Sequence, residues 1–147
     1  KIDAEKMAER GIPVVQLNTD GACHIEAMSI KNILPQFDLD HLDIIIIENI
    51  GNLVCPAEFD IGESLKVALL SIPEGDDKVE KYPLMFTRAD ALVLTKYDLI
   101  NYFEFNEERV EKNALIRNDE LKLFKVNSKN EDDIKEFKNW LISKIEE

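Results

Sequence analysis

The sequence is poor in cysteine and has no long apolar run, and each shortage excludes a class of protein. Its 147 residues contain two cysteines, too few for a small secreted fold held by a disulfide framework. The isoleucine run at residues 44–47 is far too short to cross a bilayer. We therefore expect reduced thiols, no membrane partner and a cytoplasmic location.

Positive charge is scarce as well. The 18 Lys and Arg residues stand against 30 Asp and Glu residues, which gives a formal net charge of -12. Such a surface repels nucleic acid and anionic membranes, so we expect no nucleic-acid partner, and a nucleotide would need a local binding device. The apolar content of 45% is sufficient for the core of a single domain over residues 1–147.

Apolar runs alternate with helical patterns along the chain. Runs rich in Val, Ile and Leu predict strands at residues 12–17, 43–48, 66–72, 91–95 and 121–126. Amphipathic spacing predicts helices at residues 3–10, 22–34, 79–88, 107–116 and 132–145, the third bent or restarted at Pro83. Because parallel strands need helical crossovers, this order predicts an α/β fold: a doubly wound, mostly parallel sheet with helices on both faces. Ligands of such sheets collect at the carboxyl ends of the strands.

Both cysteines and one of the two histidines fall in two short segments after predicted strands. Cys23 and His24 follow the first strand, and Cys55 follows the second. Thiolate and imidazole are ligands that Zn²⁺ and Ni²⁺ prefer, so the three residues predict an open metal site, with a further ligand from water, Glu26 or a second subunit. The alternative is two ordinary buried thiols and a loop histidine, since no C-x-x-C pair anchors the motif.

Glu48 and Gly51 follow the isoleucine-rich strand and fit a nucleotide switch. A carboxylate at this place can orient Mg²⁺ or water, and a glycine amide can reach a γ-phosphate. The alternative interpretation is a turn that ends the strand, since Asn-x-Gly-Asn is good turn chemistry.

A guanine-recognition pattern follows the last two predicted strands. Thr95, Lys96 and Asp98 depart by one residue from Asn-Lys-x-Asp, in which the aspartate accepts hydrogen bonds from the base and the lysine stem packs on its face. Ser128 and Lys129 follow the next strand, where the Ser128 amide could reach the guanine carbonyl oxygen. Each motif alone is weak, but their order on successive strand ends strengthens both.

Together these segments resemble one family of GTPases over essentially the whole chain. The carriers are Ala-Cys-His at residues 22–24, ENIGNLVCP at residues 48–56, EGDDK at residues 74–78 with Tyr-Pro at 82–83, and the Lys96-x-Asp98 tetrapeptide. They resemble the HypB family, which helps insert nickel into NiFe hydrogenase. The related urease GTPase carries a Cys-Pro-His metal motif instead.

The resemblance implies a GTP-driven metallochaperone with Mg²⁺ at its nucleotide. Its metal site would be built from Cys23, His24 and Cys55 at a nucleotide-dependent dimer interface, where Zn²⁺ and Ni²⁺ compete. By the same likeness, Glu48 and Gly51 belong to the catalytic switch that senses the γ-phosphate. The implied partners are a second copy of the chain, a HypA-type nickel chaperone and the hydrogenase large-subunit precursor.

The same likeness assigns the nucleotide-binding residues. Thr95, Lys96 and Asp98 would recognise guanine, and Ser128 and Lys129 would form the loop that contacts the base. Thr95 stands where the family has Asn, which would weaken a loop-bracing contact and leave Asp98 to select the base.

The second departure is a missing phosphate loop. The sequence starts without Met and contains no Gly-x-x-x-x-Gly-Lys-Ser/Thr motif. We therefore expect the C-terminal portion of one G domain, with GTP hydrolysis in the intact protein. By itself this chain should bind GTP negligibly, be inactive as a hydrolase, and either self-associate or be only marginally stable. Two other interpretations stay open: a non-catalytic metal-binding or dimerisation module, and a nucleotide-sensing α/β domain without a transition metal.

Overall fold

The structure, a computed structural model, describes residues 2–19 and 21–145. They fall into two compact units, Lys1–Gly62 and Glu63–Glu147. None of the described helices is both long and apolar enough to span a membrane.

The second unit is built on a parallel sheet of three strands. Strands β1 (Val67–Ser71), β2 (Ala91–Thr95) and β3 (Lys122–Val126) lie side by side in that order. The register pairs Ser71 with Thr95 and Thr95 with Val126, so the three carboxyl ends meet at one edge of the sheet. The predicted strands 66–72, 91–95 and 121–126 are therefore confirmed to within one residue.

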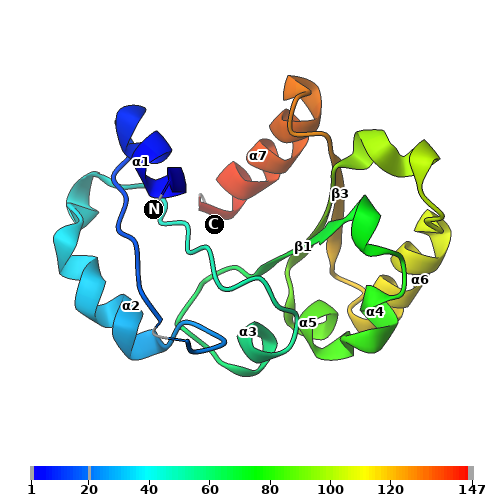
Figure 1. Cartoon of the computed structure of the whole chain (residues 1–147), viewed down its shortest axis with the longest axis horizontal. Coiled ribbons are helices and arrows are strands. Elements are labelled where there is room, and N and C mark those ends of the chain that lie inside the picture. Colours follow the sequence, from blue (N-terminus) through cyan, green and yellow to red (C-terminus); the bar gives the residue numbers. More distant parts are fainter. Residues whose placement is uncertain (1, 20, 146–147) are drawn as a thin grey trace. The chain divides into compact units, whose positions relative to one another are not determined.

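Helices cover both faces of this sheet, as the fold class required. Helix α7 (Glu131–Ile145) places Phe137 and Trp140 against Phe124, on the face that also carries Ala91 and Val93. Neighbouring side chains of a strand point to opposite faces, so the fully buried Leu92 and Leu94 face the other way. Figure 1 shows three α-helices of the second unit on that other side of the sheet: α4 (Lys78–Lys81), α5 (Pro83–Arg88) and α6 (Glu107–Arg117).

The predicted helix at residues 79–88 is two short helices separated at Tyr82. Pro83 has no N–H to donate, and its ring disfavours helical geometry in the residue before it. Tyr82 accordingly has φ -128° and ψ 58°, outside the helical region, and α5 starts afresh at Pro83.

The first unit contains helices and turns. Its helices are α1 (Ile2–Glu9), α2 (Ala27–Ile33) and α3 (Cys55–Glu58), with short 3-10 turns at Leu34–Gln36 and Leu39–His41. Helix α2 starts five residues later than the predicted 22–34, because the Ile25 N–H is held by Asn49 and Glu26 is extended at φ -93° and ψ 147°.

The strands predicted at residues 12–17 and 43–48 are wrong. Within residues 2–19 and 21–62, no segment has strand hydrogen bonds. A strand is defined by pairing with a neighbour, and neither segment has a partner in the part of the chain that is described. The expected burial fails with the pairing: Ile46 is 79% exposed, although the isoleucine run was predicted to be covered on both faces.

Candidate metal centre and guanine-recognition segments

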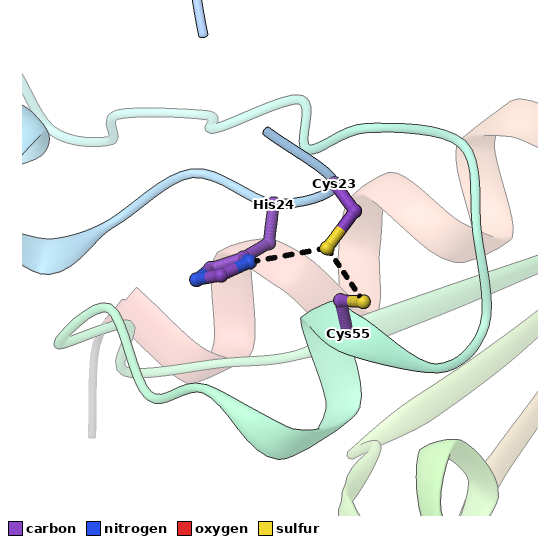
Figure 2. A group of neighbouring side chains, drawn as sticks. All are labelled: Cys23, His24 and Cys55. Atoms are coloured by element: carbon purple, nitrogen blue, oxygen red, sulfur yellow. Dashed lines mark hydrogen bonds between the residues drawn. The ribbon is translucent and has the colours of Figure 1, made fainter. Parts of the chain in front are cut away.

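The first unit brings both cysteines and His24 together. The Cys23 sulfur lies 2.8 Å from the Cys55 sulfur and 3.6 Å from Nδ1 of His24. One ligand atom from each residue lies within 4.8 Å of the other two. Figure 2 shows that the His24 nitrogen and the Cys55 sulfur both approach the Cys23 sulfur, Cys55 from the first residue of α3. The structure thus joins three residues whose spacing in sequence reaches 32 positions.

This donor set suits Zn²⁺ or Ni²⁺ and, for a tetrahedral Zn²⁺, leaves one position open. Two sulfurs bound to one Zn²⁺ at about 2.3 Å lie about 3.8 Å apart, so the two thiols must separate by about 1 Å when metal enters. Glu26 does not belong to the cluster of ligand atoms found in the described residues. The fourth position is therefore left to water or to a group from another chain.

Local contacts tune two of the ligands. The hydrogen bond with Cys23 raises the pKa of the Cys55 thiol, and desolvation raises it further. The His24 ring stacks on Phe59, with ring centroids 3.9 Å apart and planes 5° from parallel. This stacking limits the rotation of the imidazole and leaves its edge nitrogens directed away from the Phe59 face.

Glu48 and Gly51 lie in the same unit, between His24 and Cys55 in the sequence. Both are exposed, and Gly51 has ordinary backbone geometry. A Cβ at Gly51 would meet no atom within 4 Å, so packing does not require glycine there. Their assignment to a phosphate-sensing switch stays a prediction.

The second unit gathers the guanine-recognition residues at the carboxyl edge of its sheet. Thr95 ends β2 and pairs with Val126, the last residue of β3. Lys96 and Asp98 leave the edge from β2, and Ser128 with Lys129 leave it from β3. Apart from the partly buried Thr95, all of these side chains are exposed. The register therefore places both predicted segments on neighbouring strand ends, although no structural contact tests their roles.

A brace that sequence reasoning missed holds the first of these segments. Tyr97 donates a hydrogen bond to one carboxylate oxygen of Glu107, and Lys125 forms an ion pair with the other. The Lys125 ammonium also lies 5.7 Å from the centre of the Tyr97 ring. Next to this brace, Lys96 adopts φ 53°, the left-handed region that non-glycine residues rarely enter. Tyr97 occupies the variable position of the motif, so only the structure could point to it.

A family model and two curated relatives all match most of this chain. The model of the CobW/HypB/UreG nucleotide-binding domain matches residues 1–125. The hydrogenase/urease maturation factor HypB of Helicobacter pylori is 39% identical over 99% of this chain. The hydrogenase maturation factor HypB of Escherichia coli is 41% identical over 95% of it. The chain spans 62% of the first protein's length and 48% of the second's.

Two solved structures share the fold at similar identity. The crystal structure of HypB from Helicobacter pylori in complex with nickel matches with a TM-score of 0.93 and 38% identity, over 98% of this chain and 69% of that one. HypB from Archaeoglobus fulgidus matches with a TM-score of 0.91 and 32% identity, over 99% of this chain and 70% of that one.

Proposed function

We propose that this chain is part of a nickel metallochaperone GTPase. It belongs to the CobW/HypB/UreG family of nucleotide-binding domains, and the HypB maturation factors are among its relatives. This membership confirms the resemblance seen in the sequence. The task proposed is nickel insertion into NiFe hydrogenase. The observation that carries the proposal is the cluster of Cys23, His24 and Cys55, because its soft donors suit a transition metal that must be bound and later released.

Metal as cargo suits the openness of this cluster. Cys23 is exposed, while His24 and Cys55 are only partly covered. Three protein ligands leave a coordination position through which an acceptor can take the ion, whereas a closed four-ligand site would hold it. The Helicobacter pylori HypB that shares this fold was crystallised in complex with nickel, which supports nickel as the ion.

GTP hydrolysis is proposed to drive the transfer of nickel from donor to acceptor. Asp98 and Lys96 would bind guanine, Thr95 and the segment with Ser128 and Lys129 would support the base, and Glu48 with Gly51 would respond to the γ-phosphate. On this proposal residues 1–147 are part of a single G domain that acts as a homodimer with Mg²⁺ and GTP. A HypA-type chaperone and the hydrogenase large-subunit precursor would be its nickel donor and acceptor.

The metal assignment is tested by removing its ligands one at a time. Cys55→Ala and His24→Ala should each weaken Ni²⁺ and Zn²⁺ binding by more than about 100-fold, beyond the loss expected when a supporting group outside the ligand set is removed. Competition against a chromophoric chelator at pH 7.5 gives the affinities without an affinity tag on the protein.

His41→Ala is the matched control for the histidine. His41 is exposed and pairs with Asp38, within the same unit but outside the ligand cluster. It should bind metal as the unaltered protein does. If both Cys55→Ala and His24→Ala bind metal with unchanged affinity, these residues are not the metal ligands.

A further inference from the structure

Two asparagines connect the segment that carries Cys23 and His24 to the segment that carries Cys55. Asn49 and Asn52 both lie in the second segment, and each forms hydrogen bonds with the backbone of the first. In sequence they are the residues of a turn motif, Asn-x-Gly-Asn. Their side chains reach much further than a turn requires.

Asn52 bonds to the backbone of both cysteines. Its amide nitrogen donates to the carbonyl oxygen of Cys23 at 2.6 Å. Its amide oxygen accepts from the N–H of Cys55 at 2.9 Å and from the N–H of Val54 at 3.0 Å. One side chain thereby fixes the main chain at both sulfur ligands at the same time.

Asn49 has a different role, because its hydrogen bonds with other described residues all use its side-chain oxygen. That oxygen accepts from the N–H of Ile25 at 3.1 Å and from the N–H of Ile50 at 2.8 Å. Neither partner is a metal ligand. Asn49 joins the two segments through acceptor bonds alone, while Asn52 needs a donor and an acceptor together.

We propose that Asn52 is the positioning residue of the metal site, holding Cys23 and Cys55 face to face before metal arrives. The proposal rests on the proposed function, since it takes the two thiols as ligands. The cysteines are 32 residues apart and no strand pairing joins their segments in the described residues. Without Asn52, bringing the two thiols together would cost conformational entropy at the moment of binding.

Replacing an asparagine by aspartate tests this role, because it exchanges the amide nitrogen for an oxygen and changes the size of the side chain very little. In Asn52→Asp the carboxylate still accepts from Val54 and Cys55, but it presents an oxygen to the Cys23 carbonyl oxygen. The bond from Asn52 to Cys23 is lost, while the bond from Ile25 to Asn49 remains. In Asn49→Asp both acceptor bonds persist. Both variants add one negative charge to the segment that carries Cys55, and Asn52→Asp alone also breaks a donor bond to Cys23.

We expect Asn52→Asp to weaken Zn²⁺ binding by about 10–100-fold relative to Asn49→Asp, the range measured when groups that orient metal ligands are removed. Chelator competition at pH 7.5 gives the affinities, and circular dichroism confirms that both variants are folded. If Asn52→Asp fails to fold, Asn52→Ser takes its place: a hydroxyl keeps the turn but cannot reach the Cys23 carbonyl.

A second readout needs no metal. When the metal-free protein is equilibrated with oxidised glutathione, two protein thiols and one oxidised glutathione yield one Cys23–Cys55 disulfide and two reduced glutathiones. The equilibrium constant measures how well the fold holds the thiols together, and Asn52→Asp or Asn52→Ser should lower it below the value for Asn49→Asp. Equal constants and equal Zn²⁺ affinities in the Asn52 and Asn49 variants would overturn the proposal, while Cys55→Ala would still report on the metal site itself.

Discussion

Asp98 is the residue on which base selection depends in this account. It is exposed just beyond the end of β2, in a segment whose first residue is Thr95 instead of Asn. Thr95 has a shorter side chain with one hydroxyl, so it can supply less support to the neighbouring loop than an amide can. On the proposed function, recognition of the base would therefore fall more heavily on the Asp98 carboxylate.

Asp98→Asn should abolish the preference for guanine in the full-length protein. In the proposed complex the carboxylate would accept two hydrogen bonds from the base. An amide would offer a donor in place of one acceptor and leave a polar group unpaired, at a cost of about 1–3 kcal/mol. GTP affinity should then fall by about 10-fold or more, and xanthosine triphosphate should bind better than GTP.

Competition titration of the two nucleotides measures this preference. Asp119→Asn is the control, because Asp119 is exposed before β3, away from the carboxyl edge of the sheet. Retained GTP preference in Asp98→Asn would show that another residue selects the base.

At the scale of elements, Glu107 joins three parts of the second unit. It lies in the first turn of α6 and binds Tyr97 after β2 and Lys125 in β3. Burial would raise the pKa of Glu107, but the bonds from Lys125 and Tyr97 outweigh it and hold the pKa below its ordinary value. The bond with Glu107 raises the pKa of Lys125.

Glu107→Gln should lower the free energy of unfolding by about 0.2–1 kcal/mol near pH 7, the range typical of exposed ion pairs. Since the folded pKa of Glu107 is below its unfolded value, the carboxylate stabilises the fold above about pH 4.3 and this contribution disappears as the pH falls further. The variant and the unaltered protein should therefore become equally stable in acid.

Urea unfolding at a series of pH values checks this expectation. Glu108→Gln removes the same charge from the same exposed helical turn and controls for the helix dipole. A loss in Glu107→Gln that equals the loss in Glu108→Gln at every pH would exclude the brace.

The elements also show where sequence reasoning succeeds. Strands β1, β2 and β3 were predicted because their apolar runs are covered by helices, and buried residues such as Leu70 and Leu94 confirm that cause. Residues 12–17 and 43–48 carry the same kind of pattern but lack a pairing partner in the described chain. An apolar run therefore predicts a buried strand only where the fold supplies a neighbouring strand to pair with, and the run itself does not show whether that neighbour exists.

Across the whole molecule, some residues of the candidate sites could be predicted from the sequence and others could not. Cys23, His24 and Cys55 could be predicted because few residue types bind soft metals. Asn52 and Glu107 could not, since asparagine and glutamate are common and their roles depend on which backbone or side chain they meet. Residue chemistry thus points to candidate ligands, while the hydrogen bonds that hold the surrounding segments become visible only in the folded chain.

The central claim is that the fold builds a thiolate and imidazole site for a transition metal. X-ray absorption at the zinc edge of the tag-free, Zn²⁺-loaded protein tests it most directly. The account predicts a sulfur shell at about 2.3 Å together with imidazole scattering from nitrogen at about 2.0 Å, and loss of the sulfur shell in the Cys23→Ala, Cys55→Ala double variant. A first shell of oxygen and nitrogen alone in the unaltered protein would contradict it.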